Sequence, residues 1–247
     1  MSRHARLISG TGYYHVIIRG VSKQILFEDE SDYRYFLRRL EKYSEETSVK
    51  VCAFCLMTNH VHLLIHDTCG SVSLMMKKIG ISFSSYFNNK YERVGHLLQD
   101  RYLSEPIGND GQYCIVLRYI LNNPFKAGIC APEKYRWSSY HDFGKRGSFV
   151  DTSLAEELFV DKRGFEEYIK TPNDDECLEY MGARRSDEWA KDVIRDTLGI
   201  KSGTMLREYD KERRDEAIRI LRRKGMTMKQ IERLTGISKG VIQKVKA

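Results

Sequence analysis

The strongest constraint on this fold comes from two apolar, β-rich runs, residues 49–57 and 60–66, which are separated by only two residues. We predict a strand in each run and a tight connection between them. Side chains alternate between the two faces of a strand. His60 and His62 therefore share one face of the second strand, while the apolar residues between and after them face the core.

The neighbouring segments alternate between strand-like and helix-like patterns. The predicted order is a strand at 13–20, a helix beginning at 31, strands at 49–57 and 60–66, a helix beginning at 70, a strand at 101–107 and a helix at 111–123. The first six elements match a ferredoxin-like split βαβ layout. We therefore predict an α+β fold with a four-stranded antiparallel sheet and helices on one face.

Two further features describe the expected core. The predicted core positions of the helix beginning at residue 70 are Leu74, Ile79, Phe83 and Phe87. Residues 125–150 are expected to wrap back on the sheet, with Trp137 and Tyr140 as anchors. The Cys52-x-x-Cys55 pair has no second CxxC partner, and its cysteines are expected on different faces of a strand. Buried, neutral thiols are therefore favoured over a zinc or redox site.

Charge is distributed unevenly along the chain. The net charge is +6 over residues 1–150, −7 over residues 151–200 and +8 over residues 201–247. Basic segments suit a polyanionic partner, and nucleic acid is the commonest one. No apolar stretch approaches the ~18 residues that span a bilayer, and the N-terminus lacks a signal-peptide core. We therefore expect a cytoplasmic, nucleoid-associated protein that does not bind membranes.

The basic C-terminal segment has the pattern of a helix-turn-helix. A charged helix at 209–223 is followed by a short helix at 227–234, a glycine-containing turn and a final helix that begins at Ser238. The last helix would read DNA, since the second helix of this motif enters the major groove. The residues expected to contact DNA are Lys239, Gln243 and Lys244. The alternative is a helical hairpin used for packing or dimerisation.

A second segment adds chemistry to the histidine pair. Two neutral imidazoles can share a divalent ion, although a His-x-His pair alone is weak evidence. Tyr119 and Asn123 lie four residues apart and would share a helix face. Asn123 offers a carbonyl oxygen as a third ligand, which suits Mg²⁺ or Mn²⁺.

Tyr119 would lie one turn from that ion, near enough to attack a phosphate. A phosphotyrosine ester conserves bond energy, so the step can be reversed without a nucleotide cofactor. The alternative is an ordinary aromatic residue, because the chain has 15 tyrosines. Tyr113 is a rival nucleophile on the same helix, but it lacks an amide four residues further on.

Five segments give the chain a specific family resemblance. They are YHV at 14–16 with RG at 19–20, MTNHVHLL at 57–64, GHLLQDRY at 95–102, RYILNNPFKAG at 118–128 and WSSY at 137–140. Through them the chain resembles the HUH single-tyrosine transposases, and most closely the REP-associated tyrosine transposase branch. Leu98, Asp100 and Lys126 depart from the residues that the family usually has.

The resemblance implies specific roles. His60, His62 and Asn123 would hold the metal, and Tyr119 would be the nucleophile. The enzyme would cleave and rejoin single-stranded DNA beside a hairpin and leave a 5′-phosphotyrosine. Relatives act as homodimers or carry an added DNA-binding region. The resemblance covers residues 13–143 and supports a catalytic domain at 1–145. From sequence pattern alone, we predict an acidic helical connection at 146–205 and a basic helix-turn-helix region at 206–247.

Arg19, Lys77 and Arg101 are further candidates for DNA contact, because phosphate contacts dominate the affinity for DNA. For each of them, an ordinary solvated surface charge is the favoured alternative. The main alternative function is a sequence-specific DNA-binding regulator on the same fold, with an unused nuclease site. RNA processing is a weaker alternative, since the usual RNA-recognition aromatic motif is missing from the sequence.

Overall fold

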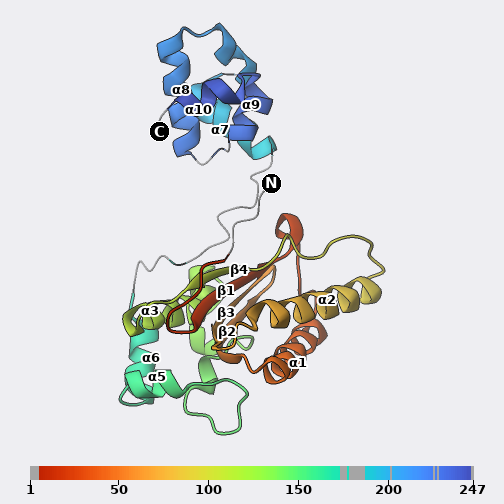
Figure 1. Ribbon diagram of the computed structural model, residues 1–247, viewed down its shortest axis with the longest axis vertical. Coiled ribbons are helices and arrows are strands. Elements are labelled where there is room, and N and C mark those ends of the chain that lie inside the picture. The colour runs from red at the N-terminus through yellow and green to blue at the C-terminus, as the bar shows by residue number, and fades with distance from the viewer. Residues whose placement is uncertain are drawn as a thin grey trace. The chain divides into compact units, whose positions relative to one another are not determined.

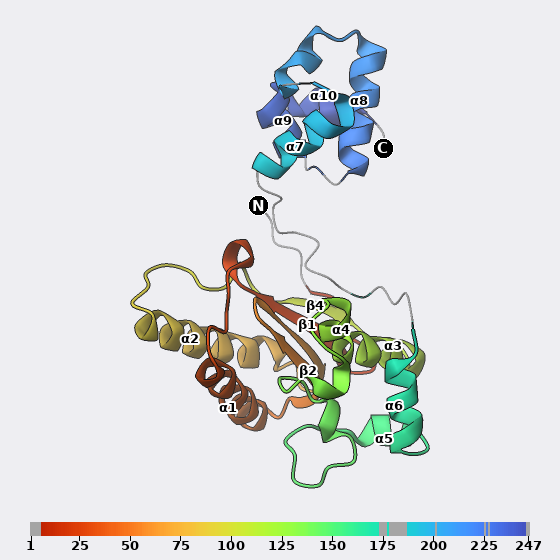
Figure 2. The same cartoon turned by 180° about the vertical axis from the view of Figure 1, so that it is seen from behind.

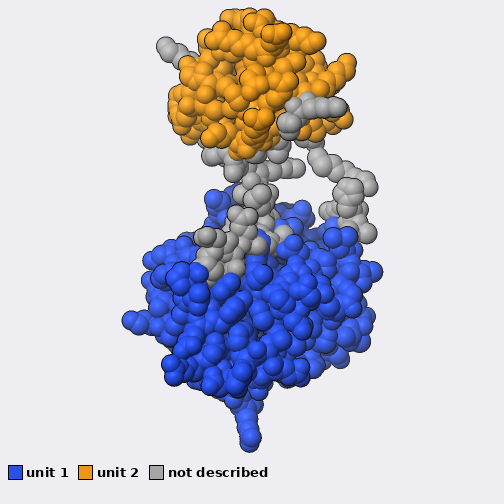
Figure 3. Space-filling model, turned by 90° about the vertical axis from the view of Figure 1, so that its left-hand side faces the viewer, with its two compact units in different colours: residues 1–181 blue, residues 182–247 orange. Residues whose placement is uncertain are grey.

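The computed structural model describes residues 6–172, 177, 187–200, 202–224, 226 and 228–245. The chain divides into two compact units, residues 1–181 and residues 182–247 (Figure 3). Each unit has a buried apolar core of its own. The two units are therefore described separately.

The first unit is built on a four-stranded antiparallel sheet (Figure 1). Its strands are β1 (Tyr13–Arg19), β2 (Lys50–Met57), β3 (His60–His66) and β4 (Leu103–Pro106). The spatial order is β2-β3-β1-β4, and every neighbouring pair is antiparallel. With one helix after β1 and one after β3, this is the split βαβ arrangement. The predicted α+β, ferredoxin-like fold class is confirmed.

Alternation along β3 separates two layers of side chains. Val61, Leu63 and Ile65 are fully buried on one face, together with matching residues of β1 and β2. His60 and His62 project from the opposite face, as predicted. The same strand therefore supports the main core and presents two imidazoles to the other side of the sheet.

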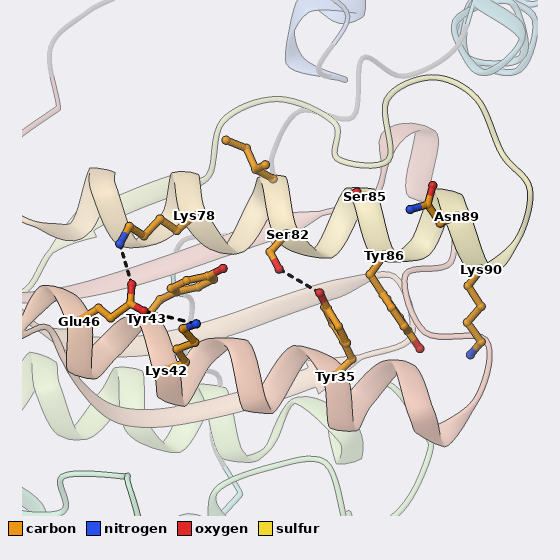
Figure 4. Close-up of a pocket in the computed structure, with 11 residues that line it drawn as sticks. Tyr35, Lys42, Tyr43, Glu46, Lys78, Ser82, Ser85, Tyr86, Asn89 and Lys90 are labelled. Carbon is orange, nitrogen blue, oxygen red and sulfur yellow. Dashed lines mark hydrogen bonds and ion pairs between the residues drawn. The ribbon is translucent and has the colours of Figure 1, made fainter.

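Helices α1 (Glu30–Thr47) and α2 (Val72–Lys90) cover the first face, side by side in both ribbon views (Figures 1 and 2). A hollow of about 950 Å³ lies between them (Figure 4). Glu46 in this hollow pairs with Lys78 and Lys42, at N–O distances of 2.7 and 3.6 Å. Because the ion pair between Glu46 and Lys78 joins the two helices, we assign this hollow to the packing of the helix pair.

The predicted core of α2 is correct at three positions and wrong at Leu74, whose side chain is 51% exposed. Met75 and Met76 are buried instead. The carboxylate of Asp67 accepts a hydrogen bond from the N–H of Val72 at the first turn of α2. This contact supplies a hydrogen-bond acceptor for an N–H group of the first helical turn, which has no partner within the helix.

The second face of the sheet is covered by α3 (Asp110–Leu121), α4 (Asn123–Lys126), α5 (Ser153–Leu158) and α6 (Lys162–Lys170). The single helix predicted at 111–123 is interrupted at Asn122, and Pro124 lies inside α4 instead of following a helix end. Proline is tolerated in the first turn, where its missing N–H would have no partner within the helix. The Asn122 amide donates a hydrogen bond to the backbone carbonyl of Ile169 in α6.

Residues 125–150 wrap back on the sheet, as predicted. The Trp137 ring stacks on Tyr33 with ring centroids 4.4 Å apart, and Tyr140 is buried. The backbone N–H of Leu56 in β2 donates to the carbonyl of Trp137 at 2.8 Å. The segment therefore covers the outer edge of β2, which would otherwise expose unpaired backbone groups.

The second unit is helical. Its described elements are α7 (Asp187–Leu198), a 3-10 helix, η4 (Gly203–Glu208), α8 (Lys211–Arg223), α9 (Met228–Thr235) and α10 (Lys239–Lys244). Its core includes Ile194, Ile218, Ile231 and Ile242, all buried. Gly236 in the turn after α9 has a φ of +69°, which glycine adopts without a Cβ penalty. Helices lie at the three positions predicted for 209–247, and residues 246 and 247 lie outside the described residues.

The region predicted as one connection, residues 146–205, is shared between the two units. Phe165 and Ile169 of α6 are buried against the first unit, whereas Ala190 and Ile194 of α7 are buried in the second. The structural division at 181/182 thus differs from the predicted boundaries at 145 and 205. The sequence analysis relied on the acidic composition of this region and did not identify the apolar face by which each helix packs against a core. Within the described residues, no helix is long and apolar enough to cross a membrane.

A buried carboxylate links α1 to the end of α2. Asp32 is fully buried and accepts hydrogen bonds from Lys90 Nζ at 2.7 Å and from the Tyr91 hydroxyl at 2.8 Å. Burial alone would raise the pKa of Asp32, but the hydrogen bonds from Lys90, Tyr91 and backbone N–H groups hold that pKa below its ordinary value.

We predict that Asp32→Asn lowers the free energy of unfolding by about 3 kcal/mol, because it leaves the Lys90 ammonium without its buried partner. The folded state depresses this pKa, so its contribution is present above about pH 4 and is lost as the pH falls through the folded pKa. Denaturant unfolding at several pH values measures both effects. Asp29→Asn is the matched control, because exposed Asp29 also pairs with Lys90. Equal losses in the two variants would contradict this account.

Candidate functional site

The predicted site residues of β3 and of the α3–α4 boundary line one cavity of about 240 Å³. The lining residues are Ile17, Arg19, His60, His62, Tyr119, Asn123, Lys126 and Ala127. Two segments about 60 residues apart in the sequence are therefore brought together by the packing of α3 and α4 on the sheet.

The imidazoles of the HxH pair both turn Nε2 toward the same amide. His60 Nε2 lies 3.3 Å from Asn123 Oδ1, and His62 Nε2 lies 3.3 Å from Asn123 Nδ2. The two ring centroids are 4.9 Å apart. The three predicted ligands thus converge on one point at the wall of the cavity.

The other ring nitrogen of His60 is held by Asn59. His60 Nδ1 lies 2.6 Å from Asn59 Oδ1, while Asn59 Nδ2 donates to the backbone carbonyl of Lys23 at 3.2 Å. The second bond fixes the amide orientation, so Asn59 Oδ1 must accept from His60 Nδ1–H. The lone pair of neutral His60 is then on Nε2, facing the cavity.

The loop that holds Asn59 depends on a glycine. A Cβ on Gly20 would lie 2.1 Å from the carbonyl oxygen of Gln24, so only glycine fits there. The Gly20 N–H donates to the backbone carbonyl of Asn59 at 3.0 Å. This close turn keeps the Lys23 carbonyl beside the Asn59 amide.

His62 has a partner that the sequence analysis did not assign. His15 of β1 is fully buried, and its Nε2 lies 3.1 Å from His62 Nδ1. Burial lowers the pKa of His15 to about 3. Burial, followed by the nearby His15, His60 and Arg19, lowers the pKa of His62 well below its usual value. Both rings are therefore neutral at neutral pH, the form that binds metal ions.

Tyr119 lies beside this pair. Its ring meets His62 and His15 edge to face, with centroids 5.6 and 5.9 Å apart. Lys126 Nζ lies 4.9 Å from the Tyr119 ring centroid. The break at Asn122 does not separate Tyr119 from Asn123, because both line the cavity. A cation beside the ring stabilises negative charge that develops on a phenolate. The sequence analysis named Lys126 only as a departure from the family pattern.

Tyr113, the rival nucleophile, lies elsewhere on α3. Tyr113 and Tyr119 are both buried, at 1% and 3% exposure, but the ring of Tyr113 packs edge to face against Tyr13 with centroids 5.2 Å apart, and only Tyr119 lines the cavity. Burial is the largest cause of the raised pKa of the Tyr113 phenol. This geometry favours Tyr119 as the reactive residue.

The donor set fits a divalent cation. Within the described part of the chain, no three His, Cys, Asp or Glu side chains converge on one point, so a site here depends on the Asn123 amide oxygen. Two imidazole nitrogens and one amide oxygen leave positions open for a phosphate and water. His60 Nε2 also carries a lone pair that faces Asn123 Oδ1, an arrangement that a cation between them would stabilise.

The CxxC cysteines are packed in the core. A β-bulge between Val51 and Ala53 shifts the alternation of β2, so Cys52 and Cys55 face the same layer instead of opposite faces. Burial raises the pKa of both thiols. This agrees with the predicted neutral thiols, since the thiolate is the reactive and metal-binding form.

The candidate DNA-contact residues are dispersed. Arg19 lines the cavity, but Lys77 and Arg101 do not, and both are exposed. In the second unit, Lys239, Gln243 and Lys244 of α10 are exposed. Of the six candidates, only Arg19 lines the cavity of the candidate site. The roles of the other five remain predictions. The five are Lys77, Arg101, Lys239, Gln243 and Lys244.

Comparisons with known proteins show what this chain is similar to. Residues 9–123 match the family model described as "Transposase IS200 like", which confirms the predicted resemblance. The structure of a REP-associated tyrosine transposase bound to a REP hairpin matches 62% of this chain and 96% of that chain, at 18% identity and a TM-score of 0.52. A crystal structure of a candidate transposase from Deinococcus radiodurans R1 matches 53% of this chain and 99% of that chain, at 15% identity and a TM-score of 0.35. No curated protein sequence matches this chain.

We predict that Asn59→Ala weakens Mn²⁺ binding about 10-fold to 100-fold, the usual effect of removing a group that orients a metal-binding histidine. Asn59→Asp should bind Mn²⁺ at least as well as the unmodified protein, because a carboxylate is a stronger acceptor for His60 Nδ1–H. Isothermal titration with Mn²⁺ measures both. Exposed Asn89 on α2 supplies the control, Asn89→Ala. Equal affinities for the alanine and aspartate variants at position 59 would argue against this role of Asn59.

Proposed function

We propose that this chain, whose residues 9–123 match the IS200-like transposase family, is a metal-dependent enzyme that cleaves and rejoins single-stranded DNA beside a hairpin. The covalent intermediate is a 5′-phosphotyrosine on Tyr119. The observation that carries the proposal is the convergence of Tyr119, His60, His62 and Asn123 on one cavity. Tyr119 is also part of the apolar core on this side of the sheet, but packing alone does not account for two histidines and an amide that line the same cavity.

His60 Nε2, His62 Nε2 and Asn123 Oδ1 would hold Mg²⁺ or Mn²⁺. Such an ion offsets the charge that builds on the scissile phosphate. The neutral state of His62, which burial enforces, keeps its nitrogen available for this role. Asn59 orients the His60 ring and His15 orients the His62 ring, each through a hydrogen bond to the Nδ1 atom that faces away from the cavity.

In the chemical step, the Tyr119 phenolate oxygen attacks phosphorus, and a P–O bond forms as the P–O3′ bond breaks. The departing 3′-oxygen takes up a proton, which balances the proton that the phenol has lost. Lys126, beside the Tyr119 ring, stabilises the phenolate and can contact the phosphate. Rejoining reverses these steps: a 3′-hydroxyl attacks the phosphotyrosine and releases Tyr119.

The second unit supplies DNA binding in this proposal. Lys239, Gln243 and Lys244 project from the exposed face of α10, while Ile242 of the same helix is buried in the core. A short helix that presents basic and amide side chains beyond a tight turn suits a recognition helix. The partner of the whole chain is thus single-stranded or hairpin DNA.

We predict that Tyr119→Phe abolishes covalent attachment to labelled single-stranded hairpin DNA and leaves DNA affinity unchanged, because only the nucleophilic oxygen is removed. The readout is a labelled band at protein mass on a denaturing gel, with Mn²⁺ present or chelated. Tyr113→Phe, on the same helix, should still form the adduct. Adducts that persist in Tyr119→Phe would reject this nucleophile. Hairpin binding with no adduct in the unmodified protein would favour a DNA-binding regulator.

We predict that Lys239→Ala with Lys244→Ala lowers DNA affinity and reduces the slope of log affinity against log salt by about two, one for each lost phosphate contact. The control removes two exposed lysines elsewhere in the second unit, Lys191 and Lys211. Fluorescence anisotropy at several salt concentrations gives both slopes. Identical slopes for the two double variants would remove α10 as the DNA-contacting helix.

A further inference from the structure

The His15 ring contacts two residues of the candidate site, the proposed ligand His62 and the proposed nucleophile Tyr119. It stacks on His62 with ring centroids 5.3 Å apart and meets the Tyr119 ring edge to face at 5.9 Å. Its Nε2 lies 3.1 Å from His62 Nδ1. Since His15 is fully buried and does not line the cavity, it can act only through its neighbours.

The contact between these two rings has two arrangements. A neutral imidazole has one N–H and one lone pair. If His62 Nδ1–H donates to His15 Nε2, His62 Nε2 presents its lone pair to the cavity. If His15 Nε2–H donates instead, the proton of His62 lies on Nε2, and that nitrogen cannot bind a metal ion.

The contrast with His60 makes this choice specific to His62. Asn59 Oδ1 can only accept, so the proton of His60 is fixed on Nδ1. His15 Nε2 can either accept or donate. On the cavity side, Asn123 directs Nδ2, a donor, at His62 Nε2. With the Asn123 amide in this orientation, the contact requires a lone pair on His62 Nε2, which is the first arrangement.

The first arrangement puts the proton of His15 on Nδ1. This nitrogen is buried and has no hydrogen-bond partner among the described residues. A buried donor without a partner is unusual in a folded protein and calls for a reason. Here the reason is that the His15 acceptor, Nε2, is directed at His62.

We propose that His15 is a positioning residue that accepts the Nδ1 proton of His62 and so holds the His62 Nε2 lone pair toward the cavity. The inference rests on the proposed metal-dependent function. It adds a residue on β1 that governs metal affinity without touching the metal or the DNA. No net proton is gained or lost, because only the position of one proton on each ring is set.

The test uses Mn²⁺ titration of the full-length protein and three variants. His15→Phe keeps a planar ring but offers no acceptor, and it should weaken Mn²⁺ binding about 10-fold to 100-fold. His15→Gln places a carbonyl oxygen near the Nε2 position, and it should retain affinity within about threefold of the unmodified protein. His66→Phe, on the same face of the sheet but stacked on Tyr13, is the control and should bind normally. Equal affinities of the phenylalanine and glutamine variants at position 15 would overturn the proposal.

A second measurement uses the unmodified protein and so does not depend on whether any variant folds. Nitrogen-15 NMR of the metal-free protein reports which ring nitrogen of His62 carries the proton. A proton on Nδ1 supports the proposal, and a proton on Nε2 overturns it. If the tautomer and the Mn²⁺ affinities follow this pattern while the hairpin DNA forms no adduct, the role of His15 stands and the strand-cleavage proposal fails.

Discussion

The two-residue repeat of β3 is the constraint on which the rest of this structure depends. Its odd positions bury Val61, Leu63 and Ile65 in the main core, and its even positions present His60 and His62 to the other face. Burial of the apolar set on one face fixes the register of the strand, because a shift by one residue would exchange the two faces. The stability of the fold and the geometry of the candidate site thus have a common origin.

Each of these two histidines is oriented by a hydrogen bond at its Nδ1 atom. Asn59 holds His60 through an amide that the backbone of the Gly20 loop fixes in place, while His15 holds His62 from the neighbouring strand. Burial keeps both His15 and His62 neutral. The site therefore combines buried, hydrogen-bonded histidines on the sheet side with Tyr119 and Asn123 on the helical side.

The sequence predicted the parts of this arrangement that local patterns determine. The alternation of apolar and polar residues predicted the strands and the shared face of His60 and His62. The order of the elements predicted the four-stranded antiparallel sheet. The sequence did not predict the break at Asn122, where the side-chain amide donates to the backbone carbonyl of the distant Ile169. The contact of His15 with His62 was also missed, although alternation in 13–20 and the adjacency of β1 and β3 could have indicated it. The division of residues 146–205 depends on which core each helix meets, and composition does not reveal that.

The most direct test of the central claim is anomalous diffraction from crystals grown with Mn²⁺. The account predicts one peak bonded to Nε2 of His60, Nε2 of His62 and Oδ1 of Asn123, with the Tyr119 hydroxyl facing the same cavity. A Mn²⁺ peak at other residues, or a His62 ring that turns Nδ1 toward the ion, would contradict it.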